Sequence, residues 1–313
     1  MDSPHNYSVS VDYAQDSDEI LFNKGKTFYW AKFFLNQHMA LQATRLYRFC
    51  RYVDDLADEA SDKKLAKNAL NCIIYDLQQG ASNDKVVTDA IALFKECDIA
   101  IEIPIELING VLADLVLVQI KTEAKLIEYC YKVAGTVGLM MCKVLNVQSS
   151  TALFHSIDLG IAMQLTNICR DVRADAVMAR IYLPETALGA MAPNELVSLD
   201  EVNRKKVLHT VKLLLIKADL YYASAFAGLC YLPFRSRMSI LIAAKLYQRI
   251  GAEIECKQFK GESIKVYIPV KLKLLISIQA CVKALFNHNF WVYRTKHNAQ
   301  LHQPIAKLPF CNG

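Results

Sequence analysis

The most informative stretch of the chain runs from Gln164 to Asp175 and reads Q-L-T-N-I-C-R-D-V-R-A-D. Its polar members Gln164, Asn167, Asp171 and Asp175 are spaced by three, four and four residues. On an α-helix these spacings place the four side chains on one face, while the flanking positions are apolar. A polar stripe on an otherwise apolar helix indicates a polar site inside a helical protein.

A second stripe lies in the segment R-L-Y-R-F-C-R-Y-V-D-D-L-A-D-E, residues 45–59. Tyr47, Arg51, Asp54 and Asp58 are spaced by four, three and four residues, and Asp55 lies beside them. Carboxylates at i and i+4 repel each other on a helix, so two such stripes in one chain need an explanation. Either they form a structural ion-pair network, or they converge on a cation.

Carboxylates that converge from two helices suit a hard divalent cation, which takes oxygen ligands and bridges to substrate phosphates. We therefore predict a site for Mg²⁺, with Mn²⁺ as the alternative, that binds a diphosphate. The predicted metal ligands are Asp54, Asp55, Asp58, Asn167, Asp171 and Asp175. The chain has no glycine-rich phosphate loop. His38, His155 and His209 are isolated, so we interpret them as surface or core residues.

The composition predicts a single all-α domain. The 313 residues are 53% hydrophobic and include only 11 Gly and 8 Pro, too few for a fold rich in turns. Apolar residues recur with helical spacing over nine segments. These are 26–59, 63–79, 84–96, 104–119, 123–145, 151–176, 200–229, 234–256 and 268–286. Only Ile264–Ile268 has the residue types of a strand. We expect no membrane-spanning helix, because lysines interrupt the most apolar segment, 270–286.

The two ends of the chain differ from the middle. We predict a polar N-terminal segment over 1–19, a helical domain over 20–286 and a basic, flexible C-terminal tail over 287–313. The tail lacks acidic residues and carries three of the five net positive charges. It either touches an anionic membrane surface or is a poorly ordered terminus. The N-terminus does not fit a signal peptide and the scattered cysteines do not fit disulfides, so we expect a cytoplasmic protein.

Several motifs together resemble the squalene/phytoene synthase family. Asp54-Asp55-Leu-Ala-Asp58 is similar to its first aspartate-rich motif, and residues 164–175 are similar to the second. The segments Y-C-Y-K-V-A-G-T-V-G (129–138) and R-I-Y-L-P (180–184) also match in order. The resemblance runs from about residue 24 to residue 275 and is closest to phytoene synthases.

The resemblance implies an isoprenoid synthase fold, a bundle of about eight to ten helices around a central cavity. It also implies the activity, in which two prenyl diphosphates are joined head to head through a cyclopropyl diphosphate. Metal-assisted ionisation of the diphosphates drives both steps. Apolar helices would enclose the prenyl chains and exclude water. Gly135, Gly138 and Gly160 either widen that channel or allow close helix packing.

Site residues carry over by motif. The resemblance implies catalytic roles for Asp54, Asp58, Asp171, Asp175, Tyr47, Arg51 and Tyr129. It implies substrate contacts for Lys24, Lys26, Thr27, Phe28, Gln164, Asn167, Arg170, Tyr247 and Lys265. The chain departs from the family at Lys24-Gly25, where the family often has His-Ser, and at Lys265, where it has Arg. These departures leave every metal ligand in place, so we expect an active enzyme.

Within the family, we predict phytoene formation from two geranylgeranyl diphosphates, without NADPH. The alternatives are squalene, dehydrosqualene or presqualene diphosphate synthesis from farnesyl diphosphate. An alternative of another class is a non-catalytic helical assembly factor of the same fold. We expect no nucleic acid and no obligate protein partner, and a peripheral contact with the inner face of a membrane, because the product is a hydrocarbon.

Overall fold

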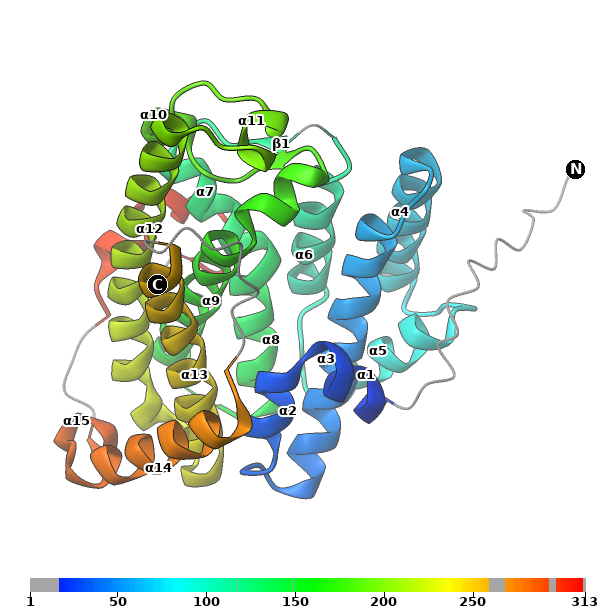
Figure 1. Cartoon of the computed structure of the whole chain (residues 1–313). Coiled ribbons are helices and arrows are strands. Elements are labelled where there is room, and N and C mark those ends of the chain that lie inside the picture. The colour runs from blue at the N-terminus through cyan, green and yellow to red at the C-terminus, as the bar shows by residue number, and fades with distance from the viewer. Residues whose placement is uncertain (1–16, 117, 148, 259–267, 293–296, 312–313) are drawn as a thin grey trace, which may run out of the picture.

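The computed structural model describes residues 17–116, 118–147, 149–258, 268–292 and 297–311. In these residues the chain is almost entirely helical (Figure 1). The longer helices are α3 (Gln37–Asp58), α4 (Lys63–Gln79), α5 (Lys85–Glu96), α6 (Glu102–Ala113), α9 (Ser150–Val177), α12 (Glu201–Gly228), α13 (Phe234–Gln258) and α14 (Val270–Phe286). The shorter ones are α1 (Ser17–Lys24), α2 (Lys26–Lys32), α7 (Glu123–Cys130), α8 (Thr136–Val144), α10 (Glu185–Leu188), α11 (Pro193–Val197) and α15 (His288–Trp291). The all-α prediction is confirmed, with somewhat more helices than expected.

Side-chain caps explain where many helices begin. The side chains of Asn36, Asp62, Asp84, Thr122 and Asp200 each accept a hydrogen bond from a backbone N–H in the first turn of the helix that follows. Each such cap satisfies a donor that has no partner within the helix, and contributes about 1 kcal/mol. Local sequence therefore fixes these helix starts.

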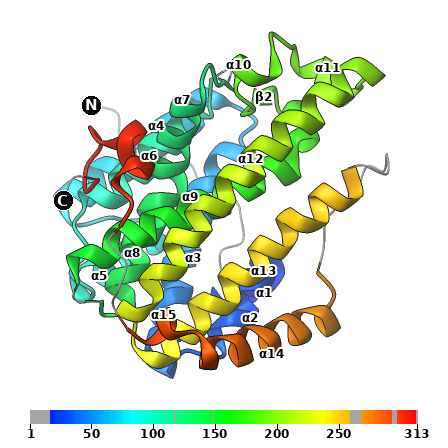
Figure 2. The ribbon, with the colours of Figure 1, turned by 90° about the vertical axis from the view of Figure 1, so that its left-hand side faces the viewer.

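Helix α9 lies at the centre of the bundle and packs against α12, α8, α13 and α11. α9 and α12 run side by side along their lengths (Figure 2). Two glycines allow the closest approach. A Cβ atom on Gly138 would lie 2.2 Å from the Ser156 carbonyl oxygen, and one on Gly160 would lie 2.2 Å from that of Ala134. Of the two interpretations of these glycines, the structure supports close helix packing.

Three predicted helices differ in detail. The segment 26–59 is interrupted after Lys32, giving α2 and α3. The segment 104–119 ends at Ala113, and Val118–Gln119 forms a strand, β1, that pairs in parallel with β2 (Arg180–Ile181). The segment 123–145 contains one π-helical turn, Tyr131–Gly135, a distortion that is frequent at functional sites. The predicted strand at 264–268 lies outside the described residues except for Ile268, which is not in a strand.

Over its described part, the C-terminal tail packs against the helical bundle. Residues 299–305 form a 3₁₀ helix, η3 (Ala299–Ile305), that packs against α7. Ile305 is fully buried, and the Tyr221 hydroxyl donates a hydrogen bond to the Leu301 carbonyl at 2.8 Å. Burial of apolar side chains such as Ile305 stabilises this packing.

By length and composition, one helical stretch among the described residues, Glu201–Tyr231, could cross a membrane. Half of its most apolar window is buried inside the bundle, where α12 packs along α9. Burial in the protein therefore accounts for its apolar composition.

Candidate active site

Helix α3 presents the first acidic stripe as predicted. Arg51 forms an ion pair with Asp55, one turn further along the helix. Asp55 is buried, Asp54 is half-buried, and Asp58 lies more exposed at the last turn of α3. The stripe thus leads from the interior of the bundle toward its surface.

Helix α9 presents the second stripe. The Arg170 guanidinium binds both carboxylate oxygens of Asp171, at 2.9 and 2.5 Å. The Asn167 amide donates a hydrogen bond to Gln164 Oε1 at 3.4 Å. Asn167 Oδ1 is buried and has no hydrogen-bond partner among the described residues. A buried oxygen without a donor is costly, so this atom is available to a metal ion or a ligand.

Arg180 connects the two stripes. It lies in β2, directly after α9, and its Nη1 lies 2.6 Å from Asp58 Oδ1 at the end of α3. Arg180 is buried, whereas Asp58 is partly exposed. The pairing of β2 with β1 holds this short segment across the end of the bundle. Arg180 belongs to the R-I-Y-L-P motif but was not among the predicted site residues.

Asp114 is a further carboxylate in the same place. It follows α6 and accepts hydrogen bonds from the Tyr129 hydroxyl at 2.8 Å and the Tyr182 hydroxyl at 2.7 Å. The two tyrosine rings stack with centroids 4.8 Å apart. Tyr129 was predicted as a site residue, whereas Tyr182 was not. The available signal for Tyr182 was its place in the R-I-Y-L-P motif, residues 180–184.

The carboxylates influence one another's ionisation, which shows that the two stripes face the same region. Burial, together with the charges of Asp58 and Asp114, raises the pKa of Asp54 to about 7 against the lowering effect of Arg51. Burial raises the pKa of Asp175 to about 8, with Asp171, Asp114 and Asp58 adding to the shift. A divalent cation bound here would favour the charged forms of these carboxyl groups.

Aromatic side chains lie at the other end of the stripes. The Phe28 ring of α2 lies between Tyr47 of α3 and Tyr247 of α13. Its centroid is 6.1 Å from that of Tyr47 and 5.4 Å from that of Tyr247. Burial raises the pKa of the Tyr247 hydroxyl, while the nearby charge of Arg170 lowers it and that of Asp171 raises it. Phe28, Tyr47 and Tyr247, predicted separately, therefore come together. Aromatic faces of this kind can stabilise a carbocation.

The predicted basic contacts are less closely grouped. Lys24 is exposed and lies 3.6 Å from Glu59, and Lys26 is exposed on α2. Thr27 is half-buried beside Phe28. Lys265 lies outside the described residues. The buried Lys273 of α14 donates a hydrogen bond to the Lys26 carbonyl at 3.2 Å, which adds a cation that sequence reasoning had not included.

The residues present fit a divalent metal held by oxygen ligands. Carboxylates from α3 and α9 and the unpartnered Asn167 Oδ1 supply the hard donors that Mg²⁺ prefers. Among the described residues, no three of these carboxylates come within 4.8 Å of one another. Such spacing suits ions that complete their shells with water and phosphate oxygens. A cavity of about 10 Å³, which would hold one water molecule, lies beside Asp175, Arg180 and Tyr182.

Comparison with known proteins agrees with this site. The family model for squalene/phytoene synthase matches residues 21–271, most of the chain. The chain belongs to the squalene/phytoene synthase family. Its stripes on α3 and α9 lie within the matched region, and so do Arg180 and Tyr247.

Relatives of this squalene/phytoene synthase family member include curated phytoene synthases. It is 32% identical to the 15-cis-phytoene synthase of Pantoea ananas over 246 residues, 74% of this chain and 80% of the relative. It is 36% identical to that of a Paracoccus species over 222 residues, 67% of this chain and 71% of the relative. A solved dehydrosqualene synthase covers 87% of this chain and 96% of its own length, with a TM-score of 0.77 and 26% identity. A squalene synthase from Alicyclobacillus acidocaldarius shares the fold, with a TM-score of 0.67 and 21% identity.

As a member of the squalene/phytoene synthase family, the protein is a prenyltransferase of the isoprenoid synthase fold, and it acts in isoprenoid biosynthesis. Its substrates are prenyl diphosphates, and the family uses a divalent metal ion. The non-catalytic alternative of the sequence analysis is thereby set aside.

Proposed function

We propose that the protein joins two geranylgeranyl diphosphates head to head, through a cyclopropyl diphosphate, to give phytoene. The convergence of the α3 and α9 stripes, joined by the Arg180–Asp58 ion pair, carries the assignment of the chemistry. Identity of 32–36% to phytoene synthases supports this product over the alternatives. The dehydrosqualene synthase fold keeps farnesyl diphosphate as the competing substrate.

Acidic and basic side chains of the site would bind the metal ion and the diphosphate. Asp54, Asp58, Asp171, Asp175 and Asn167 would hold Mg²⁺, with Mn²⁺ as a substitute. A divalent metal supplies positive charge that stabilises the departing diphosphate. Arg170 and Arg51 lie beside these ligands, where their guanidinium groups can bind diphosphate oxygens.

Aromatic and apolar side chains protect the cationic part of the substrate. Tyr47, Phe28 and Tyr247 present ring faces from three different helices. Tyr129 and Tyr182 keep their protons, because burial and the Asp114 charge raise their pKa values well above the ordinary value. They can therefore donate hydrogen bonds to Asp114 but do not act as bases at neutral pH.

The substrate is tested by incubating the purified protein with Mg²⁺ and either geranylgeranyl or farnesyl diphosphate, with and without NADPH. We expect phytoene from the C20 substrate alone, with no effect of NADPH. Asp171→Asn should abolish product, whereas Asp98→Asn, at an exposed position on another helix end, should leave it unchanged. A C30 product formed only from farnesyl diphosphate would overturn the assignment of the substrate.

We also propose a peripheral location on the cytoplasmic face of a membrane, with α14 as the contacting surface. Seven large apolar side chains of this helix are exposed, and Phe286 is 86% exposed. They are Val270, Leu274, Leu275, Ile278, Val282, Leu285 and Phe286. Lys271 and Lys283 are exposed on the same helix, and no acidic residue follows Glu262 in the chain. Apolar side chains with flanking lysines are typical of helices that lie in an anionic membrane interface.

Sedimentation with lipid vesicles tests this surface. We expect binding to vesicles that contain phosphatidylglycerol, weaker binding to phosphatidylcholine alone, and loss of binding for Leu285→Ser with Phe286→Ser. Val202→Ser changes an equally exposed apolar residue on α12 and should bind as the unaltered protein does. Equal binding by both variants would exclude α14 as the membrane surface.

A further inference from the structure

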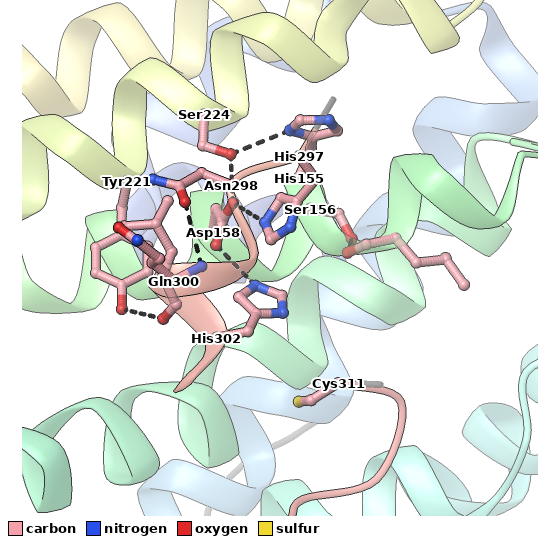
Figure 3. A network of polar contacts seen from close by, with 12 residues as sticks. His155, Ser156, Asp158, Tyr221, Ser224, His297, Asn298, Gln300, His302 and Cys311 are labelled. Carbon is pink, nitrogen blue, oxygen red and sulfur yellow. Dashed lines mark hydrogen bonds and ion pairs between the residues drawn. The ribbon is translucent and has the colours of Figure 1, made fainter. Parts of the chain in front are cut away.

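A second cluster of metal-binding residue types lies away from the acidic stripes, where the C-terminal segment crosses α9. Asp158 of α9 is fully buried. His297 Nε2 lies 2.8 Å from its Oδ2, and His302 Nε2 lies 2.9 Å from its Oδ1 (Figure 3). The three ligand atoms all lie within 4.8 Å of one another. His297 and His302 lie 139 and 144 positions after Asp158 in the sequence. Each nevertheless directs one ring nitrogen at the Asp158 carboxylate.

The buried Asp158 carboxylate is surrounded by hydrogen-bonding groups. Burial alone would raise its pKa, but the hydrogen bonds from His297 and His302 outweigh burial and hold the pKa below its ordinary value. Ser224 donates a third hydrogen bond to Oδ2 at 2.5 Å. In the described part of the chain, the ion pairs of Asp158 involve these two imidazoles and neither lysine nor arginine. A buried negative charge without a permanent cation is costly, so the cluster has a place for one.

The surrounding groups leave nitrogen atoms without partners. His302 Nδ1 and His155 Nε2 are buried and have no hydrogen-bond partner in the parts of the chain that the structure describes. His155 contacts the cluster through Ser224, 3.1 Å from its Nδ1, and its ring centroid lies 5.2 Å from that of His297. Three imidazoles around one carboxylate is an unusual density of metal-binding groups for a protein interior.

We propose that Asp158, His297 and His302 bind a divalent transition-metal ion of the Zn²⁺ class, which fastens residues 297–311 to α9. Two imidazole nitrogens and one carboxylate are a recurrent ligand set for zinc, with a fourth position for water or a neighbouring side chain. The three ligand atoms are close enough together for one four-coordinate ion to bind all of them after small shifts of the side chains.

The ion differs in kind and place from the metal of the acidic stripes. Imidazole ligands favour zinc and its neighbours, whereas Mg²⁺ prefers oxygen. Asp158 lies 13 residues before Asp171 on the same helix, about 20 Å along its axis at 1.5 Å per residue. The proposal therefore does not depend on the proposed reaction.

A bound ion would stabilise the docking of the C-terminal segment on the bundle. The segment between His297 and Cys311 is also held by the Tyr221–Leu301 hydrogen bond and by Tyr131, whose hydroxyl donates to the Pro309 carbonyl. Tyr131 belongs to the π-helical turn beside α9. An ion that binds the folded but not the unfolded chain stabilises the fold in proportion to its occupancy. The clamp would thus link tail docking to the helices that carry the site.

The test measures zinc directly in the full chain. The protein is stripped with a chelator, loaded with Zn²⁺ in excess Mg²⁺ to occupy oxygen sites, desalted, and analysed for metal. We expect about one Zn²⁺ per chain, an increased thermal midpoint, and, with Co²⁺ instead, the intense visible absorption of a four-coordinate ion. His297→Gln and His302→Gln keep a hydrogen-bond donor but remove an imidazole. The zinc content of each variant should fall about tenfold.

His209→Gln is the matched control, because His209 is exposed on α12 and should leave zinc content unchanged. Zinc-free protein after loading would overturn the proposal, and so would equal zinc in all three variants. Lower stability of His302→Gln without any zinc in the unaltered protein would also overturn it, since that result describes a hydrogen-bonded clamp without metal.

Discussion

At the scale of single residues, Arg180 connects the two parts of the site. Its ion pair with Asp58 joins two motifs 122 positions apart in the sequence. Burial tends to lower the pKa of Arg180, but Asp58, Tyr182 and Asp114 outweigh this effect and raise it. The guanidinium therefore remains charged and reduces repulsion among the carboxylates around it.

Replacing Arg180 with lysine tests this role. We expect kcat/KM to fall about 10- to 100-fold, because a charge-assisted hydrogen bond contributes about 1.5–3 kcal/mol and lysine does not reproduce the planar geometry. Steady-state kinetics with prenyl diphosphate and Mg²⁺ provide the measurement. Arg173→Lys, at an exposed position on α9, is the control. Equal loss in both variants would contradict a specific role of Arg180.

Asp54 should make the metal-free protein less stable as the pH rises. Its folded pKa of about 7 lies above the ordinary value near 4, so between these pH values the folded state holds a proton that the unfolded chain has released. Stability then falls from about pH 4 to pH 7 and stays lower above that. In chelator at pH 8, Asp54→Asn should unfold at least about 2–4 °C higher, with little difference at pH 4.

The same variant should lose activity with Mg²⁺ by about two orders of magnitude or more, because a metal ligand is removed. Asp98→Asn is the control for both measurements, since Asp98 is exposed and pairs only with Lys143 among the described ion pairs. An Asp54→Asn protein that is less stable than the unaltered chain at pH 8 would show that burial does not disfavour the charged form of Asp54 in the metal-free state.

At the scale of elements, the contact of α9 with the π-helical turn and α8 fixes where the second stripe points. Gly138 and Gly160 lie where the backbones come closest, and the atoms that a methyl group would meet are backbone carbonyl oxygens. Backbone cannot rotate away as a side chain can, so α9 would have to shift as a whole. The position of Asn167 and Asp171 thus depends on glycines two or more turns away.

Gly160→Ala should lower stability by about 1–3 kcal/mol through overpacking, even though alanine favours helix. Thermal unfolding measures the effect, and we expect weaker metal binding as α9 moves. Gly251→Ala in α13 is the matched control, because its new methyl group would meet mainly the end of the Leu215 side chain at 3.2 Å. Similar stability of the two variants would contradict the close packing of α9.

At the scale of the whole molecule, the C-terminal segment completes the bundle. Ile305 is fully buried among residues of the main core, and Cys311 is also buried. The domain prediction placed the end of the folded unit at residue 286, so the packed segment extends the fold beyond it. Residues 297–311 and α9 are therefore expected to unfold together.

Ile305→Ala tests this extension. We expect a loss of about 2–5 kcal/mol, because the substitution leaves a cavity at a fully buried position. Ile278→Ala, on the exposed face of α14, should cost little. Chemical denaturation measures both free energies of unfolding. A value for Ile305→Ala close to that of Ile278→Ala would show that the tail docks independently of the fold.

The sequence alone determined features that depend on local spacing. Helical periodicity gave nearly every long helix, and the i, i+3 and i+4 spacings placed Asp54 with Asp58 and Asn167 with Asp171. These patterns are readable because neighbours on a helix face are close in the chain. Resemblance to a family then extended the site to Phe28, Tyr129 and Tyr247.

Only the tertiary structure determined contacts between distant segments. The pairing of Arg180 with Asp58, the hydrogen bonds of Tyr129 and Tyr182 to Asp114, and the packing of Gly160 against Ala134 leave no periodic trace in the sequence. The docking of His297 and His302 on Asp158 was missed for the same reason, since charge suggested a free tail. Burial and charge balance are properties of the folded chain as a whole, and they determine which polar side chains come together.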